Sequence, residues 1–147
     1  MDSLPEKGTV RPRGIYVSSR LKHAEMWKEM RSDGIPIIST WIDQAQQGEV
    51  GNFAELWVRI EREIRSASCL VFYARNEDFP YKGALVEVGM ALAVGTPVFL
   101  VLNDVRPTGE TMRPIGSWML DLRVRHFNSI EDAIWAAREM ELQHEGM

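Results

Sequence analysis

Glu87 is the residue whose type and position most directly suggest chemistry. It is the only charged residue in the apolar stretch 84–102, and a carboxylate among apolar side chains is costly unless it is paired or hydrogen-bonded. One interpretation is structural, because the helix dipole and free N–H groups stabilise an acid in the first turn of a helix. The other is functional, because a carboxylate near the end of a buried strand is well placed for catalysis. The residues alone leave both interpretations open.

A second group of polar residues follows the first apolar run of the chain. Ser18, Ser19 and Arg20 combine two hydroxyls, a helix start and a guanidinium, which suits a phosphate or a carboxylate ligand. The alternative is ordinary helix capping by Ser19 beside a solvated arginine. The sequence has no GxGxxG after this run and no GxxxxGK[ST] anywhere, so it lacks the usual dinucleotide and P-loop motifs.

Three aromatic residues and one acid complete the candidate binding groups. Trp41 and Tyr73 lie at or near predicted strand ends, and Tyr16 lies inside the first predicted strand. Their rings could stack on a nucleobase, or they could simply belong to the core. Asp43 follows the second predicted strand, where it could bind a sugar or base or form a local turn.

These groups must be positioned by alternating strands and helices. Apolar and β-branched runs predict strands over 14–17, 35–38, 69–74, 97–102 and 124–127. Helical spacing, with Ser19, Asn52 and Ser129 as N-caps, predicts helices over 19–32, 53–67, 83–95 and 129–141. Runs that are apolar throughout are typical of strands buried on both faces. The pattern therefore predicts an α/β fold with a flavodoxin-like or Rossmann-like doubly wound sheet of about five parallel strands.

This fold class also predicts where a ligand binds. Ligands of doubly wound sheets lie beyond the carboxyl ends of the strands. The segments expected there are 18–20, 39–43, 75–83 and the loop after Asn103. Glu87 follows the third of these segments along the chain.

Composition restricts the remaining possibilities. The 147 residues are 45% hydrophobic and 26% charged, which fits a flexible lead-in over 1–13, one domain over 14–141 and a polar tail over 142–147. A formal charge of −4 offers no general attraction for a nucleic acid polymer or a membrane surface. A single cysteine, Cys69, and three separated histidines predict neither a metal site nor a disulfide. We expect a cytoplasmic protein that needs no cofactor.

The segment 83–91, which reads GALVEVGMA, resembles the G-x-x-x-E-x-G-x-A motif of the nucleoside 2-deoxyribosyltransferase-like superfamily. That superfamily includes the deoxynucleoside 5′-monophosphate N-glycosidases, and the resemblance extends over about residues 14–102. It implies that Glu87 is a nucleophile that forms a covalent glycosyl-enzyme intermediate. It also implies phosphate or 5′-hydroxyl contacts at Ser18, Ser19 and Arg20 and base contacts at Tyr16 and Trp41. We add Asp43, Tyr73 and Gly83, which opens the motif, as substrate-binding candidates.

One part of the chain departs from this family pattern. Members usually carry an aspartate eight residues before an Ala-Asp pair, whereas this chain has Ile60 ahead of Ala67 and Ser68. Glu63 and Asp43 are the nearest acids that could compensate, although neither occupies the same place. The departure concerns the group that activates the leaving base.

The resemblance gives the leading functional hypothesis. It predicts an N-glycosidase, either a hydrolase or a deoxyribosyltransferase, that cleaves the N-glycosidic bond of a small-molecule nucleotide or nucleoside. It also implies a homodimer or higher homo-oligomer, because many members complete their sites across subunits. The alternatives are a non-catalytic nucleotide-binding module of the same fold and an enzyme similar to NAD glycohydrolases.

Overall fold

Apolar strands form the centre of the molecule in a computed structural model that describes residues 13–44, 52–109 and 112–145. The strands are β1 (Ile15–Ser18), β2 (Cys69–Ala74), β3 (Val98–Leu102) and β4 (Val124–Phe127). They pair in parallel in the order β1-β2-β3-β4. Every residue of β1 and β2 is buried, as expected for strands that are covered on both faces.

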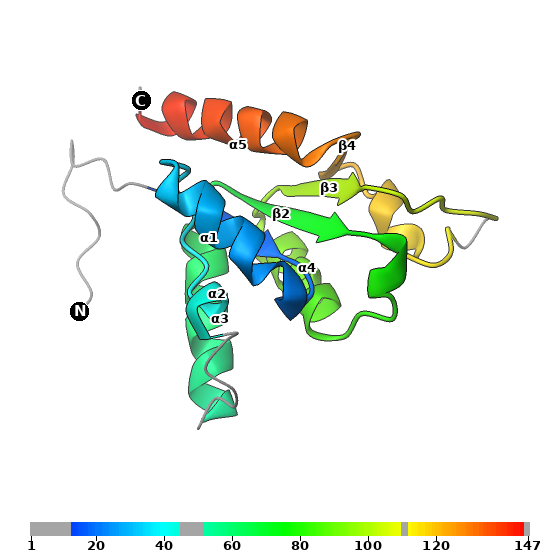
Figure 1. Cartoon of the computed structure of the whole chain (residues 1–147), viewed down its shortest axis with the longest axis horizontal. Helices are drawn as coiled ribbons and strands as arrows, with labels where there is room; N and C mark the ends of the chain where they lie inside the picture. Colours follow the sequence, from blue (N-terminus) through cyan, green and yellow to red (C-terminus); the bar gives the residue numbers. More distant parts are fainter. Residues whose placement is uncertain (1–12, 45–51, 110–111, 146–147) are drawn as a thin grey trace.

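Helices cover both sides of this sheet (Figure 1). The α-helices are α1 (Ala24–Ser32), α2 (Trp41–Gln44), α3 (Phe53–Ser66), α4 (Gly83–Val94) and α5 (Ile130–Glu145). The short 3-10 helices are η1 (Leu21–His23), η2 (Asn76–Asp78) and η3 (Ser117–Leu120). In Figure 1, α5 lies on one side of the strands and α4 on the other, with α3 packed against α4. The predicted flavodoxin-like α/β architecture is confirmed.

The predicted fifth strand is wrong. Residues 35–38 run beside β1 and form a parallel bridge between Ile37 and Ile15, but no strand. Ile15 donates to the Pro36 carbonyl at 2.8 Å and accepts from the Ile38 N–H at 3.0 Å. Pro36 has no N–H to donate to a ladder, and the Ile37 N–H donates to the Ile35 carbonyl instead. The described sheet therefore has four strands.

Helix ends agree with the sequence at three positions and differ at two. Ser129 caps α5, since its hydroxyl accepts from the Asp132 N–H at 3.1 Å. Asn52 caps α3, since its Oδ1 accepts from the Glu55 N–H at 3.1 Å, and Gly95 ends α4 with a φ of 84°. Ser19 is not an N-cap, because η1 starts only after Arg20 and no side chain caps it. The last helix was expected to end near 141 but continues to Glu145. None of the helices in the described part is long and apolar enough to cross a membrane.

Candidate functional site

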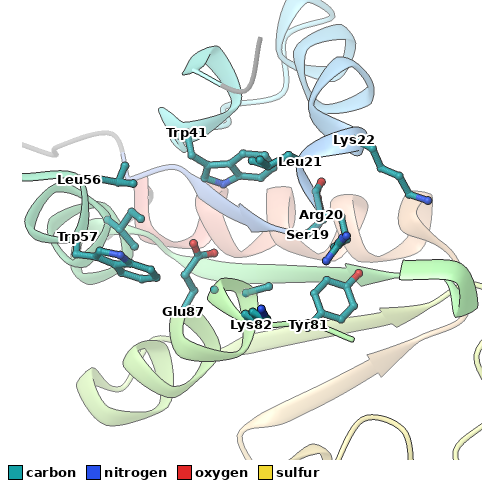
Figure 2. Close-up of a pocket in the computed structure, with 13 residues that line it drawn as sticks. Ser19, Arg20, Leu21, Lys22, Trp41, Leu56, Trp57, Tyr81, Lys82 and Glu87 are labelled. Atoms are coloured by element: carbon teal, nitrogen blue, oxygen red, sulfur yellow. The ribbon is translucent and has the colours of Figure 1, made fainter. Parts of the chain in front are cut away.

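A pocket opens beyond the carboxyl end of β1, between α2, α3 and the start of α4 (Figure 2). Its cavity volume is about 470 Å³. Its lining residues are Ser19, Arg20, Leu21, Lys22, Trp41, Leu56, Trp57, Ile60, Tyr81, Lys82, Gly83, Ala84 and Glu87. The pocket lies at the edge of the sheet where the sequence predicted ligand binding.

Glu87 is buried in this pocket, with 8% of its surface exposed. Its Oε1 accepts a hydrogen bond from the Ser18 hydroxyl at 2.7 Å. The expectation that Glu87 occupies the first helical turn is wrong, because α4 begins at Gly83 and its first turn contains no acid. The free N–H groups at the start of α4 therefore do not explain this buried carboxylate. Ser18, at the end of β1, provides the hydrogen bond instead.

The surroundings of Glu87 raise its pKa to about 7, and burial is the main cause. The negative charge of Glu63 also raises this pKa, while the Ser18 hydrogen bond and the nearby Tyr16 hydroxyl lower it. The Tyr16 hydroxyl is buried and does not reach the geometry of a full hydrogen bond with any described group. The Tyr16 hydroxyl therefore acts on Glu87 as a nearby dipole. Near neutral pH, Glu87 is divided between its protonated and ionised forms.

A second carboxylate lies close to Glu87 but does not line the pocket. Glu63 accepts hydrogen bonds from the Thr40 hydroxyl at 2.6 Å and the Thr40 N–H at 3.2 Å. Burial raises the pKa of Glu63, and the contacts with Thr40 oppose that effect. Because both of its oxygens are engaged by Thr40, Glu63 does not replace a pocket acid at Ile60.

One end of the pocket is apolar and aromatic. Trp41 comes from α2, whereas Leu56, Trp57 and Ile60 come from α3. The indole N–H of Trp41 donates to the carbonyl of Val17 at 2.7 Å, which fixes the ring over the end of β1. In Figure 2, Leu56 and Trp57 lie on one side of Glu87 and Trp41 lies above it. This end can hold a flat heterocycle by stacking.

The other end of the pocket carries positive charge. Arg20, Lys22 and Lys82 line it, and Figure 2 shows them across Glu87 from Trp57. Arg20 Nη1 donates to the Pro80 carbonyl at 3.1 Å, which ties the segment after β1 to the segment before α4. Such cations at a helix start suit an anionic group.

Asp78 holds the cationic end together. Its buried carboxylate accepts from the Arg75 N–H at 2.9 Å and lies 2.8 Å from His23 Nε2 and 3.1 Å from Lys22 Nζ. Burial acts to raise its pKa, but these contacts outweigh burial and lower it to about 2. Tyr81, which lines the pocket, donates to the same carboxylate at 3.1 Å. Asp78 is therefore ionised at neutral pH and positions the residues of the cationic end.

The structure gathers most of the predicted site residues. Ser19, Arg20, Trp41, Gly83 and Glu87 line the pocket, with Ser18 and Tyr16 directly behind Glu87. Ser19 is also fixed from behind, since its hydroxyl accepts from the Trp27 indole at 2.9 Å. The parts that these residues take in binding or catalysis stay predictions.

Two predicted residues and one predicted segment lie away from the pocket. Asp43, in α2, forms an ion pair with Arg31 of α1, at 2.6 and 3.1 Å. Tyr73 packs edge-on against His23 and Trp27, with ring centroids 4.9 and 6.1 Å away. The loop after Asn103 contributes no described lining residue. Tyr73 lies near the end of β2 as predicted, whereas Asp43 lies in α2 because residues 35–38 form no strand. Both side chains have partners outside the pocket.

The main residues that sequence reasoning missed are Leu56, Trp57 and Ile60. They belong to the apolar stripe of α3, which is the usual sign of a face packed on the core. In the structure this face packs on α4 and also forms the pocket wall. Helical spacing cannot separate these two uses of one apolar face. No group of His, Cys, Asp and Glu in the described segments is suited to hold a metal ion.

Comparison with solved structures supports the fold class. A 2-desoxiribosyltransferase from Leishmania mexicana is similar, with a TM-score of 0.61 and 16% sequence identity over 87% of this chain and 98% of that one. No family model matches the sequence, and no curated protein matches it. At this level of identity the likeness establishes a shared flavodoxin-like fold.

Proposed function

We propose that this protein is an enzyme that breaks the N-glycosidic bond of a nucleoside or nucleotide, with Glu87 as its nucleophile. The observation that carries the proposal is a buried carboxylate at the floor of the pocket, hydrogen-bonded by Ser18 between an aromatic and a cationic end. A structural neighbour named as a deoxyribosyltransferase supports it, because that name describes transfer of a nucleoside sugar.

The reaction proceeds in two displacements, as in retaining glycosidases. An ionised Glu87 oxygen attacks the anomeric carbon, the bond from that carbon to the base nitrogen breaks, and the electron pair leaves with the base. Water or a second base then attacks the same carbon, and the bond to Glu87 breaks. The departed base takes up a proton from solvent, and the attacking water or second base gives one up to solvent. The sugar is released with its configuration retained, and Glu87 is again a free carboxylate.

The two ends of the pocket orient the substrate. The base lies between Trp41 and Trp57, and the anomeric carbon lies over Glu87. A 5′-phosphate or 5′-hydroxyl points toward Arg20 and Lys82. Ser18 holds one Glu87 oxygen, so that the other oxygen is free to attack.

A panel assay tests this function. The protein is incubated with ribo- and deoxynucleosides, their 5′-monophosphates, NAD and nicotinamide mononucleotide, and free base is measured by chromatography. We expect base release that is lost in Glu87→Gln and kept in Glu29→Gln, a matched change at an exposed carboxylate on α1. Release that persists in Glu87→Gln would refute the nucleophile.

A non-catalytic nucleotide-binding module is the second candidate, and Ile60 favours it. This side chain lines the pocket where the family pattern has an aspartate, so the site has lost one polar group relative to that pattern. Binding of a nucleotide without base release, unchanged by Glu87→Gln, would support the module.

The homo-oligomer that the resemblance implies remains a prediction. Sedimentation velocity at micromolar protein concentration tests it. A mass of 16.8 kDa corresponds to the monomer, and any larger species supports the oligomer.

A further inference from the structure

We propose that the substrate of this pocket is an N-glycoside whose base carries a fixed positive charge, such as a pyridinium or an N7-alkylated purine. The inference rests on the proposed function and names its substrate class. Three features of the pocket carry it: a buried carboxylate that has no counter-ion among the described residues, an aromatic wall beside that carboxylate, and apolar side chains where the leaving base lies.

The first feature is the unpaired charge of Glu87. Within the described residues it forms a hydrogen bond with Ser18 but no ion pair, although the cations Arg20, Lys22 and Lys82 line the same pocket. Arg20 donates to Pro80, and Lys22 pairs with Asp78 and Glu77. A buried carboxylate without a counter-ion is costly, and a cationic substrate would supply that counter-ion.

The second feature is the aromatic wall beside Glu87. Trp41 and Trp57 line the base end, and the indole is the side chain whose face attracts cations most strongly. A flat cationic heterocycle between these rings and Glu87 gains stacking, cation–π attraction and charge pairing together. A neutral base gains only the stacking.

The third feature is the chemistry of the leaving group. A neutral purine or pyrimidine leaves as an anion unless an acid protonates it, and such acid catalysis contributes about 100- to 10,000-fold to a rate. At the base end, the side chains of Leu56 and Ile60 have no proton to give, and the Trp41 N–H already donates to the Val17 carbonyl. Tyr81 is engaged at the opposite end, where burial raises the pKa of its hydroxyl. The described wall therefore suits a base that needs no proton.

A base with a fixed positive charge can leave without taking up a proton. Glu87 forms its bond to the anomeric carbon, and the bond from that carbon to the cationic ring nitrogen breaks. The electron pair returns to the ring nitrogen, so the base leaves neutral and no proton moves. Water then releases the sugar from Glu87 and gives its proton to solvent.

Binding of small probes tests the charge preference without any turnover. The probes are 1-methylnicotinamide, which is a cation, and nicotinamide, its neutral counterpart, titrated by calorimetry at pH 8. We expect the cation to bind at least about tenfold more tightly, as charge pairing with a desolvated carboxylate requires. Glu87→Gln should remove most of this preference and leave only the part due to the tryptophans, and Trp57→Leu should reduce it while Trp57→Phe retains most of it. Equal affinities for the two probes in the unaltered protein would refute the inference.

Turnover tests the leaving group. We compare kcat/KM for nicotinamide mononucleotide and uridine 5′-monophosphate in the unaltered protein, Ile60→Asp and Ile60→Asn. We expect the cationic substrate to be favoured by at least about 100-fold. Ile60→Asp, which adds a proton donor, should narrow this ratio at least about tenfold, whereas Ile60→Asn, of similar shape, should not.

The outcomes separate this inference from the proposed function. Cleavage of both substrates at similar rates, dependent on Glu87, would overturn the cationic substrate and leave the glycosidase in place. Cation-selective binding without any base release would overturn the glycosidase and support a cation-binding pocket.

Discussion

Glu87→Gln should stabilise the protein at alkaline pH, although it removes the central group of the site. Gln is neutral and nearly the same shape as Glu, and its side-chain oxygen can still accept from the Ser18 hydroxyl. The variant therefore removes the ionisation of one buried group and little else. Its effect on the free energy of unfolding should depend on pH.

The magnitude follows from the pKa of Glu87, which rises from 4.5 to about 7 on folding. Each pKa unit corresponds to 1.36 kcal/mol, so the whole effect is about 3 kcal/mol. Between these two pKa values the folded state binds the proton more tightly than the unfolded state. The stability contributed by Glu87 is therefore present below pH 4.5 and is lost as the pH rises through 7. Between pH 5 and pH 8 the loss is about 2 to 3 kcal/mol.

Urea unfolding at half-unit steps from pH 5 to pH 8 measures this difference. The free energy of unfolding of Glu87→Gln minus that of the unaltered protein should increase by about 2 to 3 kcal/mol across the range. Other groups titrate in both proteins and cancel in the subtraction. Glu29→Gln, at an exposed position, should give a flat difference. A flat difference for Glu87→Gln as well would refute the buried, raised-pKa carboxylate.

Three further changes test other parts of the structure. Ser18→Ala removes the hydrogen bond that lowers the pKa of Glu87, so the rising limb of the pH profile of kcat/KM should move up by about one pH unit; an unmoved limb would contradict this contact. Asp78→Asn should lower the free energy of unfolding at pH 7, measured with urea, by about 2 kcal/mol. The unaltered protein should lose stability as the pH falls from about 4 to about 2, and the variant should lose less over the same range. Gly14→Ala places a methyl group into the Ile38 side chain and against a neighbouring backbone carbonyl. It should cost about 1 to 3 kcal/mol in the same assay, and an unchanged midpoint would show that Ile38 can move aside.

The sequence predicted the central strands well, because burial on both faces of a strand by itself produces a continuous apolar run. Runs that are apolar at every position form strands only where both faces are covered, and 69–74 and 97–102 became the central strands β2 and β3. The edge of the sheet was harder to predict. Residues 35–38 have the composition of a strand, but Pro36 removes a ladder donor.

The candidate site was predicted in part. The order of strands and helices along the chain predicted one edge of the sheet for four residues that line one pocket in the structure: Ser19, Arg20, Trp41 and Glu87. Asp43 was predicted to bind substrate but does not line the pocket, because its carboxylate forms an ion pair with Arg31 on the preceding helix. A sequence shows that a charged side chain needs a partner, but it does not show which partner lies opposite.

By itself, the sequence determined that this protein has a parallel sheet covered by helices and one carboxylate in an apolar stretch, because hydrophobic periodicity records burial residue by residue. Only the tertiary structure decided what surrounds that carboxylate. Ser18 lies 69 positions away along the chain and donates to Glu87. Trp57 and Ile60, in the apolar stripe of α3, line the same pocket. Contacts between distant segments depend on how the elements pack. Periodicity within one segment carries no information about them.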